Sequence, residues 1–284
     1  MTTLESISQL NKVFKSKNWS ERDIDEYVFD NFCKLLNNVK ESERELIIEL
    51  VEKYQWVSFA DYPQKILATL ESIEDEKIEK LKTIYFFPVI KPEDEGGFKS
   101  GQFLIYQIKA FSKHLKKYSN VKLKYVSKFE TLTDSEFKLK ENEAIFLIDD
   151  YIGSGETLNA CLDVLRSNKN ITNNKLNIIT IAVQNETSTN ITEEGISIYS
   201  DYFSPKGLSD FNDSPILDEK IKIMLEIEKL IPGGSHFSLG YNGCEGLITL
   251  ARTPDNTFPI FWMKHRIGKE KFDAPFSRDE TFEL

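Results

Sequence analysis

Two neighbouring aspartates and the loop that follows them are the residues of this chain best suited to chemistry. Asp149 and Asp150 come directly after the apolar run 144–148, and the segment GSGET follows at 153–157. Glycines let backbone N–H groups close around an anion, and the first turn of a helix adds unpaired donors and a partial positive charge. We therefore expect a phosphate group to be bound by Gly153, Ser154, Gly155, Glu156 and Thr157.

The two aspartates suit a different partner from the loop. Carboxylates accept hydrogen bonds and repel phosphate, so beside a phosphate loop they should bind hydroxyl groups or a metal ion. Paired acids followed by a phosphate loop suit a ribose 5-phosphate, with the phosphate in the loop and the ring hydroxyls on Asp149 and Asp150. The alternative is an aspartate-rich turn that caps an ordinary helix.

The elements that must position these residues alternate between strands and helices. The run 144–148 is continuous in apolar residues, which is typical of a strand buried on both faces. Further strands are expected at 84–90, 121–129 and 176–183, with helical spacing between them. This β-α-β-α-β order predicts an α/β fold with a parallel sheet, and such sheets bind ligands at the carboxyl ends of their strands.

The strand and loop resemble the PRPP-binding signature of the phosphoribosyltransferase family, where PRPP is 5-phosphoribosyl 1-pyrophosphate. The signature is an apolar strand, then D-D-x-x-x-[S/T]-G-x-T and an apolar residue. The matching residues, without a gap, are Asp149, Asp150, Ser154, Gly155, Thr157 and Leu158. The resemblance implies a parallel-sheet type I phosphoribosyltransferase-like core that binds PRPP, or a related ribose 5-phosphate nucleotide. It also implies Mg²⁺ as cofactor and transfer of the phosphoribosyl group to a nitrogen nucleophile, with release of pyrophosphate.

The same resemblance implies roles for a second loop. In the family, the loop after the first core strand binds pyrophosphate, and here that loop is KPEDEGGFKSG, residues 91–101. Lys99 would hold the pyrophosphate together with Ser100 and Gly101 at the start of a helix. The expected catalytic residues are Lys99, Asp149 and Asp150, and the two aspartates would also hold the metal, directly or through ribose or water. The competing interpretation of 91–101 is an ordinary exposed polar loop.

The whole chain divides into three expected segments. Helical spacing of apolar residues predicts a helical N-terminal region at 1–80, before a core with a C-terminal extension at 81–262 and a polar tail at 263–284. The segments GYNGCEGLITL, TPDNTFPIFW and DAPFSR resemble a bacterial phosphoribosyltransferase-like subgroup found in conflict or defence gene clusters. Two alternatives to the enzyme therefore stay open. One is a toxic effector of an antiphage system acting on nucleotide metabolism, with residues 1–80 as the docking region for a protein partner. The other is a non-catalytic sensor of PRPP or a nucleotide.

Composition excludes several other classes of function. The chain of 284 residues has 36 basic and 46 acidic side chains and a formal net charge of −10, which opposes non-specific nucleic-acid binding. Its apolar runs are much shorter than the 18 or more residues of a membrane helix, and its first residues resemble no secretory signal. We therefore expect a cytoplasmic protein with no membrane partner. Three cysteines without a CxxC pair speak against a zinc site.

Overall fold

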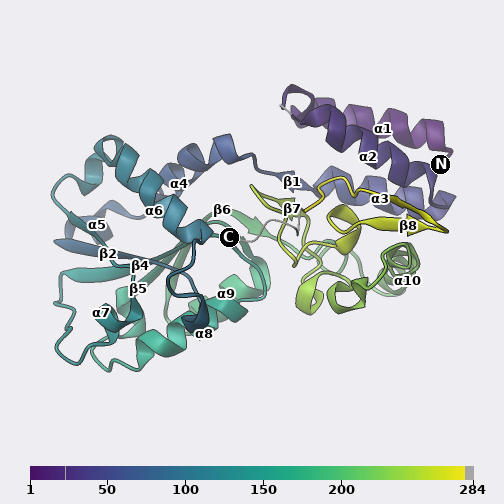
Figure 1. Cartoon of the computed structure of the whole chain (residues 1–284). Coiled ribbons are helices and arrows are strands. Elements are labelled where there is room, and N and C mark those ends of the chain that lie inside the picture. Colours follow the sequence, from purple (N-terminus) through teal and green to yellow (C-terminus); the bar gives the residue numbers. More distant parts are fainter. Residues whose placement is uncertain (23, 279–284) are drawn as a thin grey trace. The chain divides into compact units, whose positions relative to one another are not determined.

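The computed structural model describes residues 1–22 and 24–278 (Figure 1). The chain forms two compact units, which we call the sheet unit, residues 59–204, and the aromatic unit, built from residues 1–58 together with 205–278. These units differ from the expected segments 1–80, 81–262 and 263–284. The reason is that the N-terminal helices share one hydrophobic core with the C-terminal extension instead of forming a region of their own.

The sheet unit contains a five-stranded parallel sheet in the order β3-β2-β4-β5-β6. Its strands are β2 (Thr83–Pro88), β3 (Lys122–Tyr125), β4 (Glu143–Ile152), β5 (Leu176–Gln184) and β6 (Ser197–Ser204). Every residue of β5 is buried, as expected for a strand that has a neighbour on each side and helices on both faces. The predicted α/β fold with a parallel sheet is confirmed.

Helices cover both faces of this sheet (Figure 1). On one face lie α4 (Tyr62–Glu71) and α6 (Ser100–Phe111). On the other lie α7 (Phe129–Thr133), α8 (Glu156–Arg166) and α9 (Asn185–Glu193). Side chains alternate between the faces of a strand, so Ile145 and Leu147 of β4 lie on one face, and they share a hydrophobic cluster with Leu158 and Leu162 of α8. A shorter helix, α5 (Asp75–Glu79), precedes β2.

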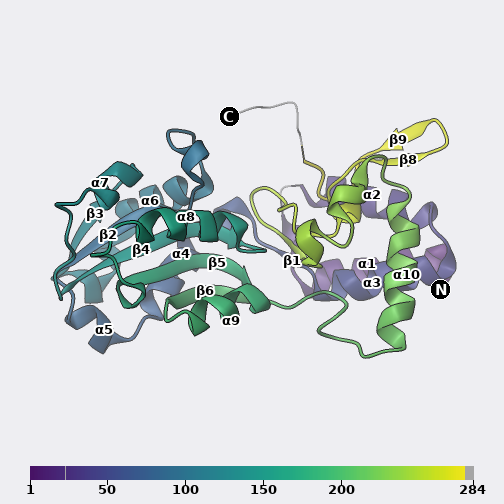
Figure 2. The same ribbon diagram turned by 90° about the horizontal axis from the view of Figure 1, so that it is seen from below.

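The aromatic unit is mainly helical (Figure 2). Its helices are α1 (Thr3–Ser16), α2 (Asp25–Asn37), α3 (Glu41–Lys53) and α10 (Ile216–Glu228). Its strands are β1 (Gln55–Trp56), which pairs in parallel with β7 (Ile248–Thr249), and the hairpin β8 (His265–Ile267) with β9 (Glu270–Phe272). None of the described helices has both the length and the apolar character needed to span a bilayer.

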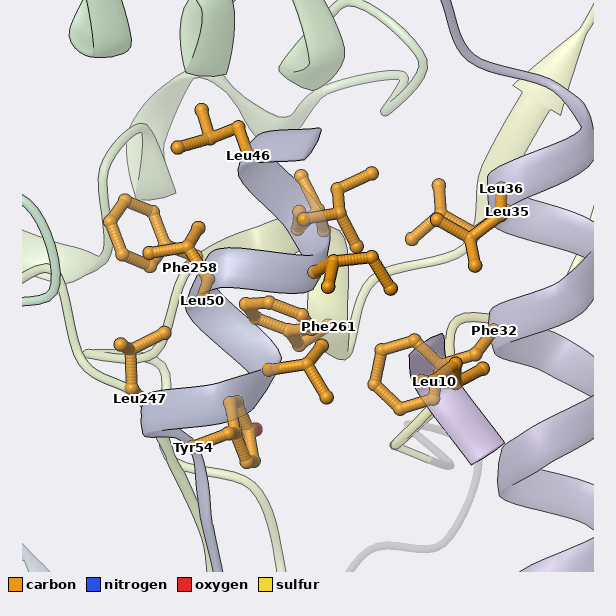
Figure 3. Close-up of a cluster of buried hydrophobic side chains, with 14 of the residues drawn as sticks. Leu10, Phe32, Leu35, Leu36, Leu46, Leu50, Tyr54, Leu247, Phe258 and Phe261 are labelled. Atoms are coloured by element: carbon orange, nitrogen blue, oxygen red, sulfur yellow. The ribbon is translucent and has the colours of Figure 1, made fainter. Parts of the chain in front are cut away.

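The apolar faces of the N-terminal helices are buried against the C-terminal extension (Figure 3). Phe32 of α2 contacts the rings of Phe261 and Phe276, and Tyr54 stacks on Phe276 with ring centroids 5.0 Å apart. Phe276 is 6% exposed, so the expected polar tail at 263–284 is in part core. Residues 279–284 of that tail lie outside the described residues.

Candidate functional site

The sheet reverses its direction of growth between β2 and β4, and this is where a ligand site is expected. The chain runs from β2 to β3 on one side and then returns to place β4 on the other side of β2. After β2 the chain enters α6 on one face, and after β4 it enters α8 on the opposite face. The two connections therefore diverge at the carboxyl ends of β2 and β4, and we call this place the crevice because open α/β sheets bind ligands where such connections diverge.

Asp149 and Asp150 lie in the part of β4 that extends past β2. The pairing of β2 with β4 ends at Pro88 and Ile148, whereas β4 stays paired with β5 as far as Ile152. The predicted strand at 144–148 is thus longer at its carboxyl end. Because β2 has already ended, the edge of β4 that carries the two aspartates borders the crevice.

Hydrogen bonds connect the two carboxylates to α6 and α4, the helices on the face of the sheet opposite α8. The Ser100 hydroxyl, at the first residue of α6, donates to Asp149 Oδ1 at 2.7 Å, and the Asp150 backbone N–H donates to the same oxygen at 2.9 Å. The Tyr62 hydroxyl of α4 donates to Asp150 Oδ2 at 2.7 Å. The structure therefore brings together Ser100 and both aspartates, and it adds Tyr62.

The electrostatics of Asp149 disfavour its charged form. Burial of its carboxyl raises the pKa well above the usual range, and the neighbouring Asp150 charge raises the pKa further. The hydrogen bond from Ser100 acts in the opposite direction but does not cancel these two effects. A ligand that brings hydroxyl donors or a cation to this carboxylate would relieve the cost of its charge.

The predicted phosphate loop leads into α8 at the expected place. The helix begins at Glu156, and Gly155 before it adopts a left-handed conformation with φ of 80° and has no side-chain cap. The first four N–H groups of a helix have no partner within it, so they and the helix dipole favour an anion at this end. Ser154 and Thr157 are half-buried beside these amides. Whether they bind phosphate stays a prediction.

Thr187 holds this loop from the next strand connection. It follows the end of β5, and its hydroxyl donates to the Gly153 carbonyl at 2.6 Å. A Cβ atom added at Gly155 would lie 2.9 Å from the Thr187 Cγ2 methyl, and the positive φ at Gly155 adds strain for any other residue. The loop is therefore closely packed as well as short.

The lysines of the loop 91–99 are both paired with acids. The Lys91 ammonium forms an ion pair with Glu156 at the first residue of α8, so the loop reaches across the crevice to the phosphate loop. The Lys99 ammonium lies 3.1 Å from Asp94 Oδ1 in its own loop. Glu95 Oε1 accepts a hydrogen bond from the Phe129 N–H at 2.6 Å. The structure brings Lys91 to the phosphate loop, while the contact it shows for Lys99 is with Asp94.

Gly101 permits close packing of α6 on the sheet, a role that its place in the sequence does not indicate. It is the second residue of α6, and a Cβ atom there would lie 2.3 Å from the Ile148 carbonyl oxygen and 3.1 Å from Pro88 Cβ. Only glycine permits α6 to approach β2 and β4 this closely, and that approach places Ser100 against Asp149. The expected start of a helix at Ser100 and Gly101 is confirmed.

Tyr62 and Thr187 are the site residues that the sequence analysis did not identify. Tyr62 lies in the N-terminal region expected to be separate from the core, and nothing in its local sequence indicates a contact with Asp150. Thr187 could have been found, because it follows the end of a predicted strand, and parallel strands bring their carboxyl ends to one edge of the sheet.

The site can supply two carboxylate ligands to a metal ion, and the other ligands would have to come from the substrate and from water. Within residues 1–22 and 24–278, no group of three or more histidine, cysteine or acidic side chains is arranged to hold a metal. Asp149 and Asp150 offer two carboxylates, and Mg²⁺ is commonly held by one or two carboxylates, with substrate phosphates and water as its other ligands. The residues therefore fit a magnesium ion that arrives with a polyphosphate ligand.

Comparison with known protein families gives a match that covers residues of both units. The sequence model of the PRTase-CE family matches residues 17–278. No curated protein sequence matches the chain. Because the match includes residues that come before and after the sheet unit in the sequence, the family shares the aromatic unit as well as the sheet unit.

Proposed function

The chain belongs to the PRTase-CE family and is phosphoribosyltransferase-like, and from this premise we propose that it binds PRPP with Mg²⁺. We further propose that it transfers the phosphoribosyl group to a nitrogen nucleophile and releases pyrophosphate. The family supports a transferase acting on a small molecule. The specific substrate and reaction are our proposal, supported by the arrangement of residues at the carboxyl ends of β2 and β4.

Each part of PRPP has a counterpart in the crevice. The 5-phosphate would lie in the loop 153–157, on the amides at the start of α8. The ribose hydroxyls would donate to Asp149 and Asp150. The pyrophosphate would lie against Ser100 and Gly101 at the start of α6, where Lys99 is close in sequence.

The chemistry this geometry suits is a displacement at the anomeric carbon. The lone pair of the acceptor nitrogen forms a bond to C1 of the ribose, the bond from C1 to the pyrophosphate oxygen breaks, and pyrophosphate leaves with the electron pair. Mg²⁺ held by Asp149 and Asp150 would neutralise charge on the phosphate groups. The protein residues need only hold the ribose and stabilise the departing anion, which depends on positioning and on fixed donors.

One observation carries this proposal: the hydrogen bond from Ser100 to Asp149. It joins the start of α6, where the pyrophosphate is placed, to the acids where the ribose is placed. The bond exists because α6 approaches β4 at Gly101. If Ser100 and Asp149 served only to cap their own helix and strand, a hydrogen bond between them would not be expected.

The test is a titration followed by an assay. Calorimetry with PRPP and Mg²⁺ should show saturable binding, and pyrophosphate should then be released only when an acceptor from a panel of purine and pyrimidine bases is added. Binding without release for any acceptor would favour a sensor. Release without an acceptor would favour an effector that consumes PRPP. Absence of PRPP binding would contradict the proposal.

A further inference from the structure

A cavity of about 390 Å³ lies at the amino end of the sheet, at the edge opposite the crevice. It is lined by residues of α5, by the first residues of β4 and β5, and by the turn before β5. Glu143 begins β4, whereas Asp149 lies six positions further along the strand. At about 3.3 Å per residue, these two positions are roughly 20 Å apart. The cavity is therefore a place separate from the candidate PRPP site.

Asn177 gives this cavity a buried acceptor without a donor. Its side chain lines the cavity, the residue is 1% exposed, and Oδ1 has no hydrogen-bond partner among the described residues. The backbone of Asn177 lies in the ladder between Phe146 of β4 and Ser197 of β6, so the strand is fully paired there. A buried oxygen with no donor costs free energy, so a molecule that donates a hydrogen bond to Asn177 Oδ1 would be stabilised there.

Lys77 of α5 gives the same cavity a cation whose side-chain hydrogen bonds go to two neutral hydroxyl groups, with the Glu74 carboxylate nearby. Its ammonium donates to Ser197 Oγ at 2.9 Å and to the Tyr199 hydroxyl at 3.1 Å. An ammonium has three N–H donors, so these two bonds leave one available. Glu74 accepts a hydrogen bond from the Tyr199 hydroxyl at 2.8 Å. Burial lowers the pKa of Lys77, because the charged form is deprived of water.

The donor and the acceptor are close enough for one small molecule to touch both. Ser197 and Asn177 are register partners on adjacent parallel strands, which lie about 4.8 Å apart. Lys77 contacts Ser197 directly, so its ammonium lies over the strand next to Asn177. Glu143, which is 8% exposed, adds a carboxylate at the start of β4 on the wall of the same cavity, and one of its oxygens, Oε2, accepts a hydrogen bond from the Lys140 backbone N–H at 3.1 Å.

We propose that this cavity binds a free amino acid or a zwitterion of similar size. The carboxylate of the ligand would accept from Lys77, and its ammonium would donate to Asn177 Oδ1 and to Glu143. A simple polyamine would leave Lys77 without an anion, and an inorganic anion would leave Asn177 without a donor and would meet the carboxylate of Glu143. The proposal does not depend on the reaction at the other end of the sheet.

Binding can be tested on the full chain by calorimetry and ligand-observed NMR, with the twenty L-amino acids first as pools and then singly. Spermidine, which carries only positive charge, and inorganic phosphate, which carries only negative charge, are the comparison compounds. We expect at least one amino acid to bind with a Kd below about 10 mM, and spermidine and phosphate to bind at least about tenfold more weakly. Failure of every amino acid to bind at that concentration, or stronger binding of either comparison compound, would overturn the proposal.

Two variants separate a binding site from a merely structural pocket. Asn177→Leu and Lys77→Met should each weaken amino-acid binding at least about tenfold, whereas Lys169→Met on an exposed turn should not. Asn177→Leu removes an oxygen that has no partner, so the unliganded variant should melt no lower than the wild type. If Asn177→Leu fails to fold, Lys77→Met alone decides the outcome. Wild-type affinity in the folded variants would overturn the assignment.

Discussion

The two units of this chain place a fully buried and a half-buried carboxylate in contrasting surroundings. In the aromatic unit, Glu245 is 4% exposed, and its two oxygens accept hydrogen bonds from the backbone N–H groups of Leu208 and Ser209, each at 2.8 Å, and from the Ser209 hydroxyl. In the sheet unit, Asp149 lies beside a second carboxylate, and its pKa is raised by burial and by that neighbouring charge. Glu245 therefore stabilises the backbone at residues 208–209, whereas the charged form of Asp149 is destabilised by its surroundings.

This contrast indicates where the sheet unit departs from what folding alone favours. Two adjacent half-buried acids destabilise a protein that has no ligand, because their charges repel each other and are partly deprived of water. Where a protein keeps such an unfavourable arrangement, it usually does so at a functional site. The aromatic unit has a core of rings from both chain segments, among them Phe32, Tyr54 and Phe276. We interpret Glu245 as an acid whose hydrogen bonds stabilise its own unit, and Asp149 as an acid whose charge a ligand would stabilise.

The largest effect on stability is expected from Glu245→Ala. Truncation leaves the N–H groups of Leu208 and Ser209 without their acceptor, and each unsatisfied buried donor costs about 1–3 kcal/mol, so the loss should be about 3 kcal/mol or more. Urea unfolding measures this loss. The matched control is Glu49→Ala, which removes partly exposed ion pairs with Lys53 and Lys220 and should cost about 1 kcal/mol or less. Equal losses would remove the contrast drawn for Glu245.

A pH series should give opposite signs for the two units. His265 is buried in the aromatic unit, its Nε2 lies 2.9 Å from the Ile260 carbonyl, and burial lowers its pKa to about 4. The unfolded chain therefore binds this proton more readily, and its contribution to stability, complete above about pH 6.5, is lost as the pH falls toward 4. Between pH 7.5 and pH 5 the loss should be about 2 kcal/mol.

For Asp149 the sign is reversed, because its pKa is raised in the folded protein. The cost of its charge is present above the folded pKa and disappears as the pH falls toward the unfolded value. Urea unfolding at both pH values should show that His265→Gln abolishes most of the acid-induced loss, whereas Asp149→Asn increases stability at pH 7. A wild-type pH slope in His265→Gln would contradict the first expectation, and a lower stability of Asp149→Asn would contradict the second.

Within the sheet unit, Thr157→Val tests the phosphate loop. The hydroxyl of Thr157 is half-buried in the first turn of α8, and removing its bond to a ligand phosphate should weaken PRPP binding by about 1–3 kcal/mol. Calorimetry compares it with Thr189→Val in α9, where the hydroxyl donates to the Asn185 carbonyl of its own helix. Equal affinities of the two variants would show that Thr157 does not contact the phosphate.

The smallest effect is expected for Lys99→Ala, and it should fall on turnover. In the protein without ligand, the Lys99 ammonium contacts Asp94. We therefore expect Lys99 to stabilise the transition state, in which charge develops on the departing pyrophosphate, more than the bound substrate. Pyrophosphate release should then fall about tenfold or more, with PRPP affinity changed less. Lys109→Ala on the exposed side of α6 is the control. Small and equal changes in both quantities would make Lys99 an ordinary surface lysine.

Much of the site-bearing core could be predicted from the sequence because its signals are local. The apolar run before Asp149 and the glycines after it indicate the strand β4 and the start of α8 within one short segment. The start of α6 at Ser100 follows a loop rich in glycine. These features depend on the nearest residues in the chain, which is why pattern and spacing suffice.

The contacts that complete the site and the aromatic unit depend on residues far apart in the chain. The bond of Tyr62 to Asp150 joins positions 88 residues apart, and the ring of Phe32 reaches Phe276 across most of the chain. Amphipathic spacing shows that α2 buries one face but not what covers that face. The compact units differ from the expected N-terminal region at 1–80 for this reason: the helices up to residue 58 pack on the C-terminal extension.

The central claim is that the acids at the end of β4 bind the ribose of PRPP, and one titration tests it most directly. PRPP with Mg²⁺ is titrated into the wild type and into the double variant Asp149→Asn with Asp150→Asn, whose fold is checked by its unfolding curve. Asparagine keeps the size of both side chains but removes the charge and half of the acceptor oxygens. We expect the folded double variant to lose measurable binding. Near-wild-type affinity in that folded variant would contradict the account.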